Sequence, residues 1–145
     1  MSTPAQEILL VEDNPNDVEL FLHTLRQSHL ADAVVHIVRD GAQALEAISA
    51  LGAHGDRIRL RVILLDLRLP KVDGLRVLQH IKSDPRMRAL PVVVFTSSDE
   101  AGDLARSYSL GANSYVVKPA DSRQFQETLD LLAKYWLQVN RYPVD

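Results

Sequence analysis

The sequence predicts an α/β fold, a doubly wound (βα)5 domain with a five-stranded parallel sheet. Five short apolar runs rich in β-branched residues recur along the 145-residue chain, and segments with apolar residues at helical spacing separate them. Most of the runs lack in/out alternation, which is typical of parallel strands that helices cover on both faces. Alternating strands and helices form right-handed crossovers, so the five repeats predict one open sheet.

The expected strands lie at 8–11, 34–38, 62–65, 92–95 and 115–117. Val18, Phe21 and Leu25 form the apolar stripe of the first helix. Pro15 falls in its first turn, where the missing N–H of a proline costs no helical hydrogen bond. Apolar residues at helical spacing mark the other four helices: Leu45, Ile48 and Leu51; Leu75, Leu78 and Ile81; Leu104, Ala105 and Tyr108; Phe125, Leu129 and Leu132. A longer polar connector is expected from Gly52 to Arg59.

Composition narrows the class of protein. The chain has the length of one ordinary domain, and we expect that domain to span residues 5–140 with no output domain after it. No apolar run approaches the roughly 20 residues that cross a bilayer, and the start lacks a basic signal-peptide region. The absence of cysteine excludes disulfides and thiolate metal sites and favours the cytoplasm. The net charge of -3 argues against nucleic acid as the main partner.

Chemically reactive side chains follow four of the five expected strands. The first strand ends in Glu12 and Asp13, the third in Asp66, the fourth in Thr96, and the fifth in Lys118-Pro119. In a doubly wound sheet, sites lie outside the carboxyl ends of the strands, so these groups are expected to converge at one edge.

These groups fit phosphoryl transfer to a carboxylate. Three carboxylates in one cleft repel one another unless a cation joins them, and hard oxygen ligands suit Mg²⁺. A carboxylate can act as the nucleophile that forms an acyl phosphate. The remaining need is for positioning and charge neutralisation, which Mg²⁺, Lys118 and the hydroxyl of Thr96 can supply.

The motifs LLVEDN, LLDLRLPKVDG, VVVFTSS and YVVKP, in this order and on these strands, make the whole chain resemble the receiver domains of two-component response regulators. The resemblance implies a flavodoxin-like receiver fold and a phosphoryl group taken from a histidine kinase. It also implies that the chain is not an enzyme beyond its own phosphorylation and dephosphorylation.

The resemblance assigns roles residue by residue. It makes Asp66 the phospho-acceptor, Asp13 a direct Mg²⁺ ligand and Glu12 its water-mediated companion, with the backbone carbonyl of Arg68 completing the metal site. Thr96 and Lys118 would hold the phosphoryl oxygens, and the Lys118-Pro119 bond would be cis. Thr96 and Tyr115 would form the switch, with Tyr115 turning inward as Thr96 moves toward the phosphoryl group.

A narrower resemblance joins this chain to single-domain regulators paired with phytochrome-type histidine kinases. It rests on VEDNPNDVELF, the long loop before the third strand, SDPRMRALPVVVFTSS and YWLQVNRYP. It implies a homodimer through the fourth and fifth helices, which the apolar residues Tyr135, Trp136, Val139 and Tyr142 would suit.

The sequence departs from the family at Glu12, at Arg68 and in the longer loop from Gly52 to Arg59, and the main alternative stays open. Glu12 replaces the commoner aspartate, and Arg68 stands two residues after the acceptor, where a long cationic side chain can block or orient an attacking water. The alternative is a phosphorylation-independent scaffold with a receiver fold. A hydrolase fits poorly, because position 68 holds arginine and not a second aspartate. A nucleotide-binding domain does not fit, because no GxGxxG follows the first strand.

Overall fold

The computed structural model describes residues 5–52 and 59–143, and within them it confirms the predicted α/β class. One sheet holds five parallel strands in the order β2-β1-β3-β4-β5. The strands are β1 (Glu7–Val11), β2 (Val34–Val38), β3 (Leu60–Leu65), β4 (Val92–Thr96) and β5 (Ser114–Val117). The helices are α1 (Pro15–Gln27), α2 (Gly41–Gly52), α3 (Gly74–Ser83), α4 (Ala101–Ser109) and α5 (Ser122–Lys134), followed by the π-helix η2 (Tyr135–Val139).

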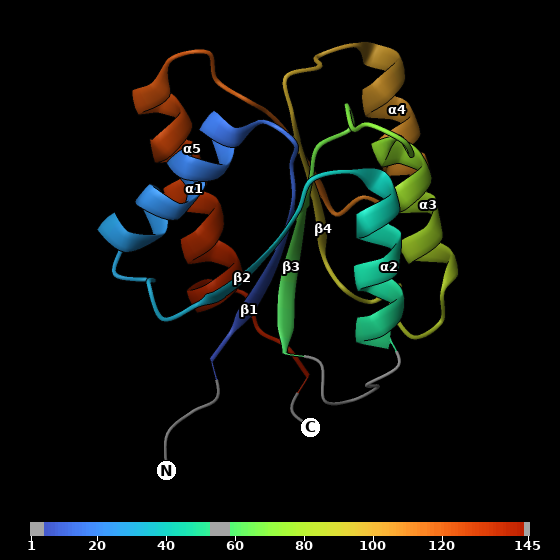
Figure 1. Cartoon of the computed structure of the whole chain (residues 1–145), viewed down its shortest axis with the longest axis horizontal. Helices are drawn as coiled ribbons and strands as arrows, with labels where there is room; N and C mark the ends of the chain where they lie inside the picture. The colour runs from blue at the N-terminus through green and yellow to red at the C-terminus, as the bar shows by residue number, and fades with distance from the viewer. Residues whose placement is uncertain (1–4, 53–58, 144–145) are drawn as a thin grey trace.

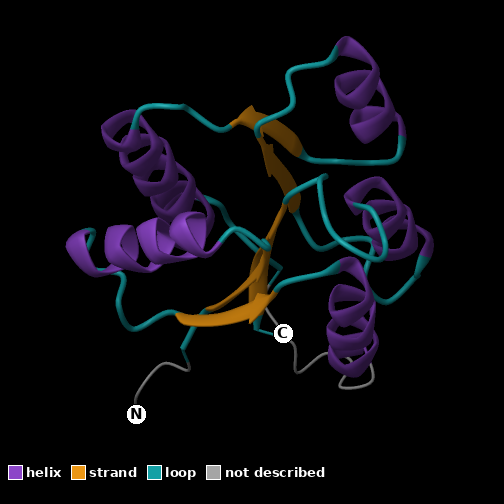
Figure 2. Cartoon of the chain, turned by 45° about the horizontal axis from the view of Figure 1, so that its top comes forward, coloured by secondary structure: helices purple, strands orange, loops and turns teal. Residues whose placement is uncertain are grey.

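The sheet lies between two layers of helices, with α1 and α5 on one face and α2, α3 and α4 on the other (Figures 1 and 2). Because side chains alternate along a strand, each central strand feeds both layers. In β1, Leu9 and Val11 pack into the core under α2 and α3, whereas Ile8 and Leu10 pack under α1 and α5. This double burial explains the continuous apolar runs in the sequence.

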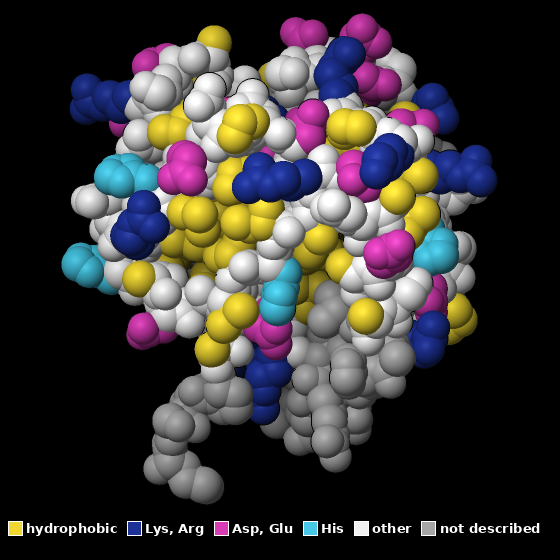
Figure 3. Space-filling model, viewed as in Figure 1, with side chains coloured by type: hydrophobic (Ala, Val, Ile, Leu, Met, Phe, Trp, Pro, Cys, Tyr) yellow, Lys and Arg dark blue, Asp and Glu magenta, His cyan; other side chains and the backbone are white. Residues whose placement is uncertain are grey.

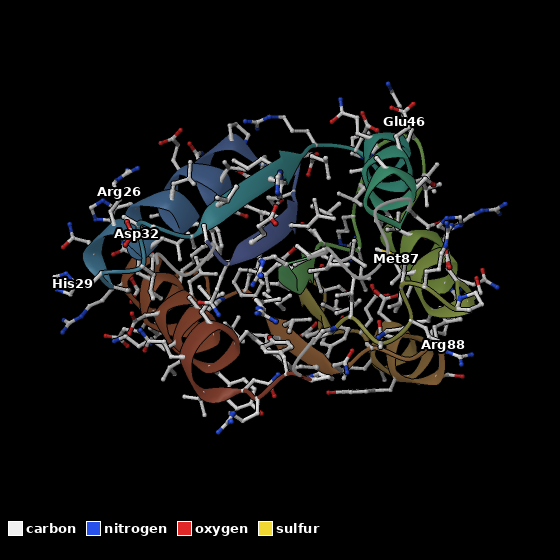
Figure 4. All side chains as sticks on the ribbon, turned by 90° about the horizontal axis from the view of Figure 1, so that it is seen from below. Arg26, His29, Asp32, Glu46, Met87 and Arg88 are labelled. Carbon is white, nitrogen blue, oxygen red and sulfur yellow. The ribbon has the colours of Figure 1, made fainter. Side chains whose placement is uncertain are left out.

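Met87, labelled in Figure 4, is fully buried and closes the core under α2 and α3 at the amino-terminal edge of the sheet. The strand β2 differs from the central strands because it is an edge strand. Its side chains are only partly buried, and Val34 is exposed. Figure 3 shows hydrophobic side chains gathered on this side of the molecule.

Residue patterns explain where the helices begin. The side chain of Asn14 accepts hydrogen bonds from the N–H groups of Asn16 and Asp17, and Pro15 occupies the first helical position of α1. Asp73 caps α3 and Asp121 caps α5 in the same way. These caps fix the start of α1 and α3 directly beside the carboxyl edge of the sheet.

The structure differs from the sequence prediction in α4 and leaves most of the predicted connector before β3 undescribed. The predicted inner face of α4 is wrong at two of its three residues, since Ala105 and Tyr108 are exposed and only Leu104 is partly buried, while the buried residue of that helix is Ser107. The helix is short and mostly polar, so spacing alone identifies its inner face poorly. Most of the predicted connector at 52–59 lies outside the described residues, as does the side chain of Leu51.

None of the described helices is both long enough and apolar enough to cross a membrane.

Candidate functional site

The strand register brings the predicted residues to one edge. Val11 pairs with Leu65, and Leu65 pairs with Val94, so these three residues lie level across the sheet. The backbone ladder runs one step further, because the Asp66 N–H donates to the Val11 carbonyl at 3.1 Å. The residues that follow the strands therefore lie at a common edge of the sheet, as expected from parallel strands.

Most of the polar groups at this edge are buried. Glu12 is 2% exposed, Asp66 6% and Thr96 0%, whereas Asp13 is exposed. Buried carboxylates need partners, because an isolated charge is costly to remove from water. Each buried carboxylate has them. One Glu12 oxygen accepts from the Asn14 N–H at 3.2 Å, and Asp66 Oδ1 accepts from the Arg68 N–H at 3.1 Å.

The three carboxylates form a compact cluster. Glu12, Asp13 and Asp66 each offer an oxygen, and the three oxygens lie within 4.8 Å of one another. An all-oxygen, carboxylate-rich set fits a hard divalent cation such as Mg²⁺ and does not fit soft metals. The acidic cluster therefore has the chemistry of a metal site.

Lys118 is the cation at the centre of this edge. Its Nζ lies 2.6 Å from Glu12 Oε1, 2.8 Å from Asp66 Oδ2 and 2.8 Å from Asp17 Oδ2, and its side chain is only 9% exposed. Burial alone lowers the pKa of an ammonium, but the hydrogen bonds to the three carboxylates outweigh burial and raise the pKa of Lys118 above its ordinary value. Lys118 therefore stays charged at neutral pH.

Glu12 shows the opposite balance. Burial is the largest influence on its carboxyl and raises the pKa, while the hydrogen bond and charge of Lys118 lower it and the nearby charge of Asp66 raises it again. The net result is a Glu12 pKa of about 7. This carboxyl consequently changes its protonation near neutral pH.

Arg68 and Thr96 flank the acceptor carboxylate. The Arg68 side chain is exposed, and its Nη2 lies 3.9 Å from Glu100 Oε1, so the guanidinium extends toward the loop between β4 and α4. The Thr96 Oγ1 accepts a weak hydrogen bond from the Ser98 N–H at 3.4 Å. Thr96 is thus linked to the same loop.

Tyr115 also reaches this loop. Its hydroxyl donates to the Ser98 carbonyl oxygen at 2.8 Å, and its partly buried ring packs against the core under α2 and α3. Ser98 Oγ in turn donates to Asp103 Oδ2 of α4 at 2.5 Å. Side chains of β4, β5 and α4 are therefore joined through Ser98.

The structure corrects one expectation at this edge. The Lys118-Pro119 bond is trans and not cis. Trans is the form of lower free energy for an X-Pro bond, by about 0.5–1 kcal/mol. From the trans backbone Lys118 already reaches all three carboxylates, so its contacts need no cis bond.

Sequence reasoning missed Asp17, Ser98 and Asp103. Asp17 could have been found, because it lies in the first turn of a helix that begins directly after the acidic pair. Ser98 and Asp103 gave no such signal, since their contacts depend on the path of the loop between β4 and α4.

Comparison with known proteins agrees with this geometry. Residues 8–130 match the family described as the response regulator receiver domain. A probable methanogenesis regulatory protein, FilR2 of Methanothrix harundinacea, is 43% identical over 136 residues, covering 94% of this chain and 86% of that protein. The response regulator Rcp1 of Synechocystis is 35% identical over 142 residues, covering 98% of this chain and 96% of Rcp1.

Solved structures give the same result. The phosphorylated cyanobacterial phytochrome response regulator RcpA has a TM-score of 0.88 and 37% identity, covering 97% of this chain and 100% of RcpA. The Mn²⁺-bound form of Rcp1 has a TM-score of 0.86 and 35% identity, covering 96% of this chain and 99% of that chain. This chain therefore belongs to the response regulator receiver domains, which are two-component phosphorelay proteins that partner with histidine kinases and are not conventional enzymes.

Proposed function

We propose that this chain accepts a phosphoryl group on Asp66 from a histidine kinase, in a Mg²⁺-dependent reaction, and signals through contact with other proteins. The observation that carries the proposal is the setting of the Asp66 carboxylate. It is buried at the carboxyl edge of the sheet, with Oδ2 at 2.8 Å from Lys118 Nζ and two further carboxylates beside it.

The metal site we propose uses Asp13 and Asp66 as direct ligands, Glu12 through water and the Arg68 backbone carbonyl. Mg²⁺ bound there supplies positive charge that reduces repulsion between the acceptor and the incoming phosphoryl oxygens. The acidic cluster supports this assignment, and so does the Mn²⁺-bound form of the relative Rcp1.

The chain's own residues carry the remaining steps. An Asp66 carboxylate oxygen forms a bond to phosphorus while the bond from phosphorus to the kinase histidine nitrogen breaks, and that nitrogen keeps the electron pair. Lys118 donates hydrogen bonds to the phosphoryl oxygens, and the Thr96 hydroxyl donates another. The exposed Arg68 side chain, two residues after Asp66, is proposed to affect the access of water to the acyl phosphate.

Phosphorylation is proposed to act through Thr96 and Tyr115. A Thr96 hydroxyl drawn to the phosphoryl group gives up its weak hydrogen bond from Ser98, whose carbonyl also accepts from Tyr115. The loop between β4 and α4 and the ring of Tyr115 then move together. The acyl phosphate biases a two-state equilibrium because it contacts one state better than the other.

A phytochrome-type kinase is the partner we propose, on the strength of the likeness to RcpA. We also propose a homodimer through the face formed by α4, β5 and α5. On this face Leu131 is 70% exposed, Val139 of the neighbouring η2 is 62% exposed and Tyr135 is 46% exposed. Adjacent exposed apolar side chains favour burial against a second copy. Leu131→Glu should convert a dimer to a monomer in analytical ultracentrifugation, and a wild-type monomer at all concentrations would contradict the dimer.

The test of phosphorylation is mass spectrometry after incubation with acetyl phosphate, with and without Mg²⁺. Wild type should gain the mass of one phosphoryl group only with Mg²⁺, and Asp66→Asn should gain none. Asp32→Asn is the matched control, because Asp32 is an exposed aspartate at the opposite end of the sheet (Figure 4). No gain by wild type in Mg²⁺ would favour the phosphorylation-independent scaffold.

A further inference from the structure

Asp17 is a fourth carboxylate at the site, outside the metal cluster. It lies in the first turn of α1, its side chain is 18% exposed, and its Oδ2 is 2.8 Å from Lys118 Nζ. The cluster of oxygens suited to a cation contains Glu12, Asp13 and Asp66 and does not include Asp17. Asp17 therefore contacts the site through Lys118.

An acidic residue in a first helical turn has an ordinary explanation, since it interacts favourably with the helix dipole. That explanation does not require the side chain to reach a lysine 101 residues away. The backbone of Asp17 is fixed by the cap, because Asn14 Oδ1 accepts its N–H at 3.3 Å. The position of the carboxylate is thus set by the start of α1 and directed at one partner.

The ammonium of Lys118 has three N–H donors, and three carboxylates take them. Two of these carboxylates have other work in the proposed reaction. Asp66 becomes an acyl phosphate and loses its charge, and Glu12 shares its charge with the metal ion. Among the three partners of Lys118, Asp17 alone is neither the proposed acceptor nor part of the acidic cluster proposed to bind the metal ion.

We propose that Asp17 is a positioning residue that holds the Lys118 ammonium at the acceptor while Glu12 and Asp66 are engaged. The inference rests on the proposed phosphorylation of Asp66. Without Asp17, the other carboxylate partners of Lys118 are the acceptor and a residue of the proposed metal site, and its flexible four-carbon stem is held less firmly at the phosphoryl oxygens.

A double-mutant cycle tests this proposal. It compares wild type, Asp17→Asn, Lys118→Met and the double variant. One readout is the initial rate of Mg²⁺-dependent phosphorylation by acetyl phosphate, and the other is the urea midpoint of unfolding without metal. Asp17→Asn should slow phosphorylation about tenfold, the lower end of the roughly 10–100-fold loss seen when a residue that orients a metal ligand is removed. In the Lys118→Met background the same change should leave the remaining rate unaltered.

The unfolding arm does not depend on activity. Asp17→Asn should lower the midpoint in the wild-type background, because an ion pair is lost. With Lys118→Met it should leave the midpoint unchanged or raise it, because it then removes a carboxylate that only repels its neighbours. Effects of the helix dipole are equal in both backgrounds and cancel.

Two further variants sharpen the test. Asp17→Glu keeps the charge and should recover most of the phosphorylation rate. Glu19→Gln makes the same kind of charge change on an exposed side of α1 and should alter neither readout. Equal effects of Asp17→Asn in both backgrounds, or a rate at or above that of wild type, overturn the positioning role. If wild type takes no phosphoryl group, the proposed function fails, and this result is distinct from a phosphorylating protein in which Asp17 and Lys118 are uncoupled.

Discussion

Replacing Gly74 by alanine should destabilise the fold and displace the proposed acceptor. Gly74 begins α3 and lies against the backbone that carries Asp66. A Cβ at this position would lie 2.4 Å from the Asp66 carbonyl oxygen and 2.5 Å from Leu67 Cα. Both are backbone atoms, so no rotamer change can relieve the contact. The start of α3 or the end of β3 must move by roughly 1 Å to restore ordinary packing.

The expected loss in the free energy of unfolding for Gly74→Ala follows from that contact. Overpacking against atoms that cannot rotate costs about 3 kcal/mol, the upper part of the usual range. Alanine recovers up to about 1 kcal/mol of helix propensity. The net loss in the free energy of unfolding is therefore about 2 kcal/mol, which lowers the urea midpoint by about 1 M for a protein of this size.

Gly102 provides the matched control. It lies within α4, and a Cβ there would meet nothing within 4 Å. Gly102→Ala should raise the free energy of unfolding by about 0.5–1 kcal/mol, because only the helix propensity changes. Urea unfolding followed by circular dichroism measures both variants, and phosphorylation by acetyl phosphate should slow only in Gly74→Ala. If Gly74→Ala proves as stable as wild type, the reasoning from the contact is refuted.

Three other perturbations have expected outcomes. Burial raises the pKa of Glu12 to about 7. Below about pH 7 this carboxyl carries a proton, which must be released when Mg²⁺ binds. Mg²⁺ affinity by calorimetry should accordingly fall about tenfold from about pH 8 to about pH 6, and Glu12→Gln should remove this dependence. Because the folded state holds this proton more tightly than the unfolded state, metal-free wild type should also lose stability as pH rises through the window between 4.5 and about 7. Lys82→Met should lower the free energy of unfolding by about 2–3 kcal/mol, since Lys82 Nζ donates to the Arg88 carbonyl, the Leu90 carbonyl and Asn113 Oδ1. Lys134→Met, which removes an exposed pair with Asp130, should change it by less than about 0.5 kcal/mol in the same urea titration. Tyr115→Phe removes the hydrogen bond to the Ser98 carbonyl and should lower the free energy of unfolding by about 1 kcal/mol. An unchanged urea midpoint would show that this hydrogen bond does not contribute to stability.

The order of strands and helices could be predicted from the sequence because burial on both faces leaves a local pattern. Each central strand carries a run of apolar residues buried on both faces, and each helix packed on the sheet carries an apolar stripe, so both leave a local pattern in the sequence. The edge strand β2 has the same apolar run although it is only partly buried. For α4 the pattern gave the wrong inner face at Ala105 and Tyr108, because the buried position is the polar residue Ser107.

The membership of the site could also be predicted, although the roles of its residues stay proposals. Parallel strands end at a common edge, so the residues that follow Val11, Leu65 and Val117 had to come near one another. This argument needs only the strand ends, which the sequence marks. It predicted the convergence of Glu12, Asp66 and Lys118 without any knowledge of side-chain conformation.

The contacts within the site were decided by the tertiary structure. The pairing of Asp17 with Lys118 depends on how α1 docks beside the sheet, and the bond from Tyr115 to Ser98 depends on the path of a loop. The sequence by itself determined which groups lie at the edge, because strand ends are local features. Only the tertiary structure determined which of them touch, because a contact between groups 101 residues apart requires the packing of whole elements.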